Sequence, residues 1–180
     1  MGHSWGGFST MNICALHPDV THIVAMAGFP AVEALFRSAA KGILAPLRHV
    51  FLQEEAKSNP DYYNRSAFGA LQTCEAHCLL IYSDKDMLCT KAAFYDPLCK
   101  ALADKKNISL LLCNGKGHNP NYTQKAEKYL AQYVKERKKF IKSKPDDAQK
   151  KAFVASYDWW AMTDQDEAVW EKIFEVLDRE

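Results

Sequence analysis

The stretch Met1-Gly2-His3-Ser4-Trp5-Gly6-Gly7 opens the chain and carries its most informative local pattern. A serine stands two residues after Gly2 and two residues before Gly6. Small neighbours leave room for a sharp turn in which the central residue takes a strained backbone conformation. From Ser4 to about Leu16, apolar residues recur near helical spacing until a proline stops the run. The sequence therefore predicts that this serine lies in a tight turn that leads into a helix.

The bulk composition is ordinary for a soluble protein with its own core. The chain has 180 residues, of which 48% are hydrophobic and 25% are charged, and the net charge is +1. A balance so close to neutral gives no reason to expect a nucleic-acid partner. No run approaches the about 20 apolar residues that a membrane-spanning helix needs, and the glycine-rich start is unlike a signal peptide. We therefore expect a cytoplasmic protein without a membrane span.

The cysteines do not follow a metal-binding or redox spacing. The six are Cys14, Cys74, Cys78, Cys89, Cys99 and Cys113. Cys74 and Cys78, with a histidine between them, come nearest to a pattern, and they match neither zinc motifs nor redox motifs. We therefore expect reduced, mostly buried thiols and no metal site.

Apolar runs alternate with helical patterns along the chain. Three runs that end near turn residues are typical of buried strands: Thr21–Ala27, Cys78–Tyr82 and Ile108–Cys113. Helical patterns fill the intervals over Ala31 to about Ala56 (with breaks near Gly42 and Pro46), Ser66–Cys74, Lys91 to about Lys105, and Thr123 to about Lys142, and Asn59-Pro60-Asp61 reads as a turn. This alternation predicts an α/β protein, with a short and mainly parallel sheet flanked by helices.

The C-terminal tail reads as helical. Thr163 and Asp166 have the spacing of a capping box before a last helix. The stripe expected to be apolar in that helix comprises Val169, Trp170, Ile173, Phe174 and Leu177. Tyr157, Trp159 and Trp160 are interpreted as aromatic anchors that pack the tail on the core, although they would also suit the lining of an acyl pocket.

Three polar residues follow the ends of predicted strands, in the order Ser4, Asp86 and His118. The carboxyl ends of parallel strands meet at one edge of a sheet, so these side chains are expected to converge. His118 would act as the base for Ser4, and Asp86 would orient the imidazole. The Trp5 backbone N–H would donate to a developing oxyanion, and His3 would pack or hydrogen-bond beside the turn.

Three segments carry a family resemblance: GHSWGG at 2–7, IYSDKD at 81–86 and GKGH at 115–118. In this order, each after an apolar strand, they resemble the nucleophile, acid and histidine segments of the α/β-hydrolase family. The resemblance covers about residues 1–130 and implies a partial α/β-hydrolase fold. It also implies that the strands before the nucleophile, and the loop that supplies a second oxyanion donor, lie outside this sequence. The family usually has glycine where Ser83 stands, which makes Asp84 a weaker candidate than Asp86 for the acid.

The domain division follows from the same resemblance. We expect a hydrolase core over 1–143 with a cap-like helical insert over about 31–70, and a helical extension over 144–180 that packs on the core. In the insert, Phe36, Leu44, Leu47 and Phe51 either shape a substrate pocket or pack as ordinary helix contacts.

The resemblance implies a serine hydrolase that acts on a small-molecule acyl substrate through an acyl-Ser4 intermediate, with no metal or organic cofactor. The turn fixes the nucleophile and not the leaving group, so esters, thioesters, amides and lactones all remain open. The alternative is a truncated, catalytically inactive fragment. Such a fragment would self-associate as a homo-oligomer through an exposed sheet edge beside Thr21–Ala27.

Overall fold

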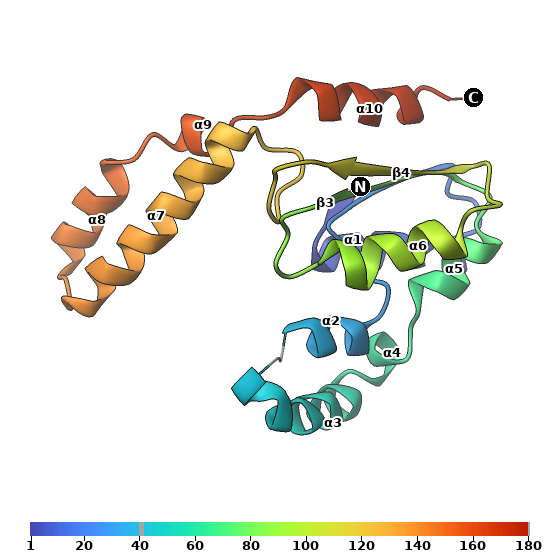
Figure 1. Cartoon of the computed structure of the whole chain (residues 1–180), viewed down its shortest axis with the longest axis horizontal. Helices are drawn as coiled ribbons and strands as arrows, with labels where there is room; N and C mark the ends of the chain where they lie inside the picture. The colour runs from blue at the N-terminus through green and yellow to red at the C-terminus, as the bar shows by residue number, and fades with distance from the viewer. Residues whose placement is uncertain (40–41, 180) are drawn as a thin grey trace.

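The computed structural model describes residues 1–39 and 42–179, with the side chains of residues 42–44 left out. Four strands form one parallel sheet in the order β1-β2-β3-β4 (Figure 1). Their bounds are Gly2–His3 for β1, His22–Met26 for β2, His77–Ser83 for β3 and Ile108–Cys113 for β4. The predicted α/β class and parallel sheet are confirmed, and the short strand β1 adds a neighbour to β2.

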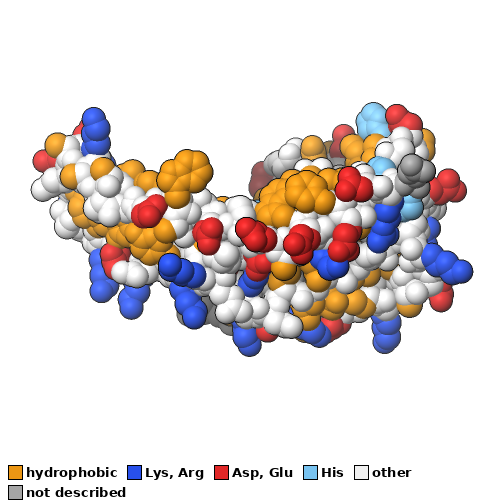
Figure 2. Space-filling view, turned by 90° about the horizontal axis from the view of Figure 1, so that it is seen from above, with side chains coloured by type: hydrophobic (Ala, Val, Ile, Leu, Met, Phe, Trp, Pro, Cys, Tyr) orange, Lys and Arg blue, Asp and Glu red, His pale blue; other side chains and the backbone are white. Residues whose placement is uncertain are grey.

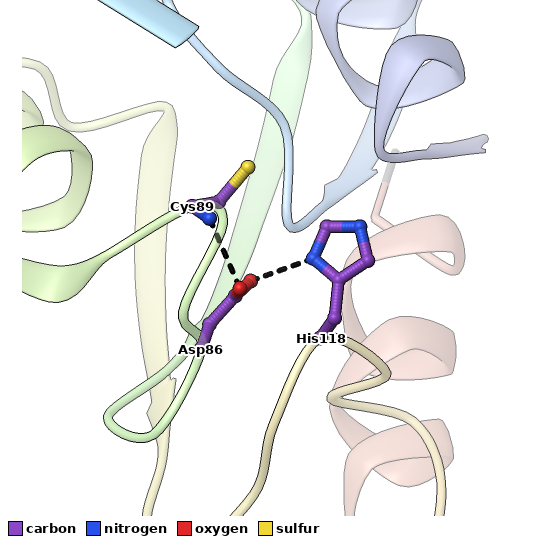
Figure 3. A group of neighbouring side chains, drawn as sticks. All are labelled: Asp86, Cys89 and His118. Atoms are coloured by element: carbon purple, nitrogen blue, oxygen red, sulfur yellow. Dashed lines mark hydrogen bonds and ion pairs between the residues drawn. The ribbon is translucent and has the colours of Figure 1, made fainter. Parts of the chain in front are cut away.

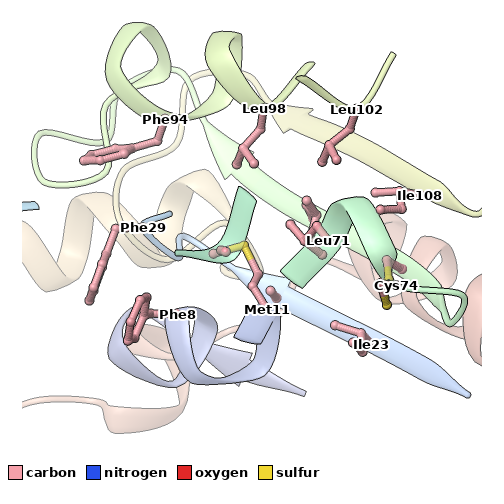
Figure 4. Packing of buried hydrophobic residues seen from close by; sticks show 14 of the residues in the cluster. Phe8, Met11, Ile23, Phe29, Leu71, Cys74, Phe94, Leu98, Leu102 and Ile108 are labelled. Atoms are coloured by element: carbon pink, nitrogen blue, oxygen red, sulfur yellow. Dashed lines mark hydrogen bonds between the residues drawn. The ribbon is translucent and has the colours of Figure 1, made fainter. Parts of the chain in front are cut away.

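Helices cover one face of the sheet around the larger hydrophobic cluster. They are α1 (Trp5–Asn12), the 3₁₀ turn η1 (Ile13–Ala15), α5 (Ala67–Thr73), the π-helical turn η3 (Lys91–Tyr95) and α6 (Asp96–Ala101). Figure 4 shows Met11 of α1 close to Leu71 of α5 and Phe8 of α1 beside Phe29, with Leu98 of α6 and Ile23 of β2 in the same cluster. Alternate residues of β2, β3 and β4 face this cluster, because successive side chains of a strand point to opposite faces.

The last helix, α10 (Glu167–Leu177), covers the other face of the sheet. Val169, Ile173 and Val176 are buried against β2 and β3. The predicted stripe is wrong at Phe174 and Leu177, which are exposed, because the face that meets the sheet turns toward Val176. The predicted capping box is also wrong: Asp166 itself caps the helix, with its side chain accepting from the backbone N–H of Ala168.

The segment between β2 and α5 forms a separate group of helices. Its elements are α2 (Val32–Ala39), the 3₁₀ turn η2 (Gly42–Leu47), α3 (Arg48–Ser58) and α4 (Pro60–Tyr63). The break predicted at Asn59-Pro60-Asp61 is present at Asn59, which separates α3 from α4, whereas Pro60 and Asp61 already belong to α4, where the missing N–H of Pro60 costs nothing. The rings of Phe36 and Phe51 stack with centroids 6.5 Å apart, whereas Leu44 lies outside the described side chains.

Helices α7 (Gln124–Lys142), α8 (Asp147–Ala155) and α9 (Trp159–Met162) form an arm that extends away from the sheet (Figure 1). Phe140 of α7 stacks on Phe153 of α8 with ring centroids 4.3 Å apart. The expectation that Trp159 and Trp160 anchor the tail in the core is wrong, since they are 44% and 88% exposed. Helix α8 is held by aromatic contacts with α7 within the arm. Figure 2 shows that the surface is hollowed between the arm and the rest of the molecule. The proposed domain boundary at 143 and 144 falls at the tip of this hairpin.

Cys14 and Cys74 form a disulfide, so the prediction of six reduced thiols is wrong for this pair. The two residues are 60 positions apart and meet because η1 and the end of α5 pack on the same face of the sheet. Cys78, Cys89 and Cys113 are free and buried, and Cys99 is free and partly exposed.

Over the described ranges, none of the helices combines the length and the apolar character needed to cross a bilayer.

Candidate active site

Ser4 occupies the tight turn between β1 and α1. Its backbone has φ 57° and ψ −116°, a strained conformation for a residue with a side chain. Its backbone N–H donates to the Met26 carbonyl oxygen at 2.9 Å, which fixes the turn against β2. A Cβ at Gly2 would collide with the Gly6 carbonyl oxygen, so Gly2 is required to be glycine. At Gly6, by contrast, an added Cβ meets no atom of the described residues within 4 Å. We expected both glycines to leave space for the turn at Ser4, but only Gly2 is needed for it.

The three predicted site residues come together at the carboxyl edge of the sheet. His118 Nε2 lies 3.0 Å from Ser4 Oγ, and His118 Nδ1 lies 2.8 Å from Asp86 Oδ2. Because Nδ1 faces the carboxylate, it carries the proton, which leaves Nε2 free to accept from the serine hydroxyl. The order of groups is that of a nucleophile, a base and an orienting acid.

Asp86 is buried and held in its ionised form. Only 3% of the residue is exposed. Burial raises the pKa of this carboxyl, but hydrogen bonds from His118 and from the backbone N–H groups of Leu88 and Cys89 outweigh burial and bring the pKa below its ordinary value. The side chain therefore presents a fixed negative charge to the imidazole.

A carboxylate on α7 fixes the loop that carries His118. Glu127 Oε2 accepts from the Gly117 backbone N–H at 2.6 Å, and Glu127 Oε1 accepts from the Asn119 backbone N–H at 2.9 Å. An added Cβ at Gly117 would meet this carboxylate, so a larger residue there would displace the Glu127 side chain. Sequence reasoning missed Glu127. The one feature of the sequence that could have indicated its role is its place in the first turn of the helix that follows the His118 loop.

Further contacts tie the same loop to its surroundings. The buried Lys116 ammonium donates to the Pro120 carbonyl oxygen at 2.8 Å and to Asp166 Oδ2 at 2.5 Å, which links the loop to the start of α10. His3 Nε2 donates to the His118 carbonyl oxygen at 2.7 Å, and Asp84 Oδ1 accepts from the Gly115 backbone N–H at 2.6 Å. Asp84, the weaker acid candidate, thus bonds the loop and not the imidazole.

The backbone N–H of Trp5 lies at the first position of α1. N–H groups in the first turn of a helix have no carbonyl partner within the helix, and the helix dipole makes this end positive. The Trp5 side chain is exposed, and its ring lies edge-on to Phe29 with centroids 4.8 Å apart. Met87 and Leu88, next to Asp86, are exposed as well. The backbone next to Ser4 therefore presents a positive helix end, and the side chain of the neighbouring Trp5 is exposed.

Figure 3 shows a thiol beside the carboxylate and the imidazole. Cys89, three residues after Asp86, is buried, and ligand atoms of Asp86, Cys89 and His118 all lie within 4.8 Å of one another. Oxygen, sulfur and nitrogen donors in this number are a possible ligand set for a metal ion. Sequence reasoning expected no metal site, because these residues stand at no recognised spacing.

Comparisons with known proteins identify the fold. No model of a protein family matches the sequence, and no curated protein does. Among solved structures, the chain is similar to a puromycin-hydrolyzing peptidase of Mycobacterium tuberculosis, with a TM-score of 0.50, 19% identity, and coverage of 65% of this chain and 18% of that one. The chain has an α/β-hydrolase fold.

Two other solved structures are similar to different shares of the chain. A candidate dipeptidyl aminopeptidase IV of Bacteroides ovatus is 21% identical with a TM-score of 0.47, over 66% of this chain and 16% of that one. A serine hydrolase of Cycloclasticus zankles is 18% identical with a TM-score of 0.42, over 81% of this chain and 64% of that one. The chain thus spans less than a fifth of the length of the peptidases.

Proposed function

We propose that this chain is a serine hydrolase that cleaves carboxylic esters or related acyl compounds. The observation that carries the proposal is the pair of hydrogen bonds in series, from Ser4 Oγ to His118 Nε2 and from His118 Nδ1 to Asp86 Oδ2, at 3.0 Å and 2.8 Å. The strained backbone of Ser4 supports it, since strain of this kind concentrates at functional turns. The α/β-hydrolase fold adds the expected order of the three residues along the chain.

In the proposed reaction, His118 takes the hydroxyl proton as Ser4 Oγ attacks the substrate carbonyl carbon. The carbonyl oxygen becomes an oxyanion, and the Trp5 backbone N–H together with the positive end of α1 stabilises it. His118 then gives the proton to the leaving group, which departs and leaves an acyl group on Ser4. A water molecule, activated by His118 in the same way, releases the acid and regenerates the serine.

Asp86 has two tasks in this scheme. Its carboxylate keeps the proton of the neutral imidazole on Nδ1, and it stabilises the imidazolium that forms when His118 takes the serine proton. Burial makes both effects stronger than they would be in water. The chain's own residues supply the nucleophile, the base, the orienting acid and one oxyanion donor, so the proposed reaction needs no metal or organic cofactor.

Covalent labelling of the full chain tests the proposal. A fluorophosphonate probe is expected to form one adduct on Ser4, identified by mass spectrometry of the peptide. Ser4→Ala is expected to abolish the adduct, and His118→Ala to slow its formation by about 10³-fold or more, since removing a triad member leaves only weak residual reactivity. Ser58→Ala, at an exposed position on α3, serves as the matched serine control and keeps full labelling. A folded wild-type chain that forms no adduct would rule the proposal out.

The second candidate function is an inactive fragment that self-associates, and one observation favours it. Strand β1 pairs with β2 only at Ala25 and Met26. Among the described residues, the N-terminal half of β2 therefore has a strand partner on one side only. Unpaired strand edges of this kind readily pair with another chain. Labelling and oligomeric state are independent measurements, so the two candidates can be separated.

A further inference from the structure

The donor atoms of Asp86, Cys89 and His118 form a cluster that the proposed hydrolysis does not fully use. A carboxylate oxygen, a thiol sulfur and an imidazole nitrogen lie within 4.8 Å of one another. Asp86 and Cys89 are 3% and 1% exposed, whereas the His118 side chain is 24% exposed. The Cys89 thiol has no task in the scheme above, because only its backbone N–H contacts Asp86.

We propose that Zn²⁺ binds between Asp86, the Cys89 sulfur and His118 Nδ1, and that this binding switches the hydrolase off. The inhibitory effect rests on the proposed serine-hydrolase function, whereas the metal site itself does not. Zinc takes carboxylate, thiolate and imidazole ligands in a tetrahedral arrangement and often keeps one position for water. Three protein ligands and one water complete such a site.

The donor atoms are near the positions that zinc requires. Bonds of about 2.0–2.3 Å place two tetrahedral ligands about 3.3–3.8 Å apart, so a cluster within 4.8 Å needs side-chain movements of about 1 Å. Hydrogen bonds from neighbouring groups also fix the orientation of the ligands. Backbone N–H groups of Leu88 and Cys89 orient the Asp86 carboxylate, and Glu127 orients the His118 loop. Such outer contacts raise metal affinity by fixing ligand geometry.

The Cys89 thiol is inert until a metal is present. Burial, and next to it the charge of Asp86, raise the pKa of Cys89 to about 12. A bound divalent cation reverses this balance and removes the thiol proton, which passes to solvent. One proton is therefore released for each zinc ion bound, and the sulfur becomes a thiolate ligand.

Binding at Nδ1 explains the inhibition without blocking the serine. In the metal-free triad, Nδ1 carries the imidazole proton and Nε2 accepts from Ser4 Oγ. Zinc on Nδ1 takes the place of that proton, which moves to Nε2. An Nε2 that carries a proton cannot accept the serine hydroxyl proton, so Ser4 loses its base while its position is unchanged. The site therefore couples metal binding to the protonation of a single imidazole.

The first arm of the experiment measures binding alone. Co²⁺ added to the full chain is expected to give a thiolate-to-cobalt charge-transfer band with one equivalent bound, and Zn²⁺ is expected to displace it. Cys89→Ala should remove the band and weaken Zn²⁺ binding in calorimetry by at least about 100-fold, because even loss of an outer-shell partner costs about 10–100-fold. Cys113→Ala, a buried free cysteine on β4, is the matched control and keeps both signals. Equal cobalt spectra and zinc affinities for Cys89→Ala and wild type would overturn the inference.

The second arm measures the consequence for Ser4. Fluorophosphonate labelling of the wild type is expected to stop with Zn²⁺ and to return after chelation, whereas Cys89→Ala, compared with itself, labels equally with and without Zn²⁺. Zinc inhibition that persists in Cys89→Ala would overturn the inference and point to the adjacent His3–His118 pair. If the cobalt band forms but no condition gives labelling, the metal site stands and the proposed function fails. If labelling occurs and the band never forms, the function stands and this inference fails.

Discussion

Glu127 accepts hydrogen bonds from the two peptide N–H groups that flank His118. The two distances are 2.6 Å to the N–H of Gly117 and 2.9 Å to that of Asn119. A single carboxylate on the first turn of α7 thus holds both sides of the residue that bridges Ser4 and Asp86. Since small misplacements of a catalytic group have large effects on rate, this contact should influence reactivity more than its distance from Ser4 suggests.

Replacement of Glu127 by glutamine should slow labelling of Ser4. The variant keeps the size of the side chain, but its NH₂ group would face a backbone N–H, and one of the two charge-assisted hydrogen bonds is lost. We expect a rate of fluorophosphonate labelling that is lower by about 10-fold or more, measured at the pH where the wild type labels fastest. Glu171→Gln on the exposed face of α10 is the control, and equal rates for both variants would contradict a positioning role.

Replacement of Asp166 by asparagine should loosen the contact between α10 and the His118 loop. Asparagine still caps α10, but it leaves the buried Lys116 ammonium, which is 5% exposed, without its ion-pair partner. Removing one partner of a fully buried pair costs about 3 kcal/mol, and because the Asp166 side chain is 27% exposed we expect a smaller loss of about 1–2 kcal/mol. Urea unfolding at neutral pH should report this loss, and Asp178→Asn at the exposed end of α10 should change stability little.

The same pair predicts a loss of stability in acid. The hydrogen bond from Lys116 holds the pKa of Asp166 below its ordinary value. A carboxyl whose folded pKa is depressed contributes stability above its unfolded pKa of about 4, and this contribution disappears as the pH falls through the folded value. Between about pH 5 and pH 3, wild type should therefore lose more stability than Asp166→Asn. Thermal unfolding at a series of pH values tests this. If stability falls equally with pH in the two proteins, the pair makes no contribution.

Alanine at Gly2 and at Gly6 should have opposite effects, although both glycines flank Ser4. A Cβ at Gly2 collides with backbone, and overpacking of this kind costs about 1–3 kcal/mol. A Cβ at Gly6 meets open space on α1, where alanine favours the helix by up to about 1 kcal/mol. Thermal unfolding of both variants tests this. Equal destabilisation would show that the turn at Ser4 needs both glycines for steric reasons.

Self-association through the β2 edge should appear at concentrations of tens of micromolar. Static light scattering is expected to show a mass above that of one chain, falling on dilution. Hydrogen exchange separates this edge from the other one: protection should rise with concentration in β2 and stay constant in β4, whose outer edge serves as an internal control. A monomer at all concentrations would exclude the prediction.

Local patterns predicted the elements around the site well. The apolar runs over Cys78–Tyr82 and Ile108–Cys113 correspond to β3 and β4, because a buried parallel strand needs a continuous apolar run. The convergence of Ser4 and His118 also followed, since every strand of a parallel sheet ends at the same edge. Predictions that depended on which surface a side chain meets were less accurate. Trp160 is an example, because periodicity does not show that its helix packs on α7 and away from the sheet.

The sequence by itself determined strands β2, β3 and β4 and the strained turn at Ser4, because each depends on residues that are neighbours in the chain. Only the tertiary structure decided the contacts of Glu127 with the His118 loop, the Cys14–Cys74 disulfide, and the meeting of Cys89 with Asp86 and His118. These contacts join segments whose separation in sequence bears no relation to their distance in space. Packing of the helices on the sheet sets those distances, and the residue types alone do not.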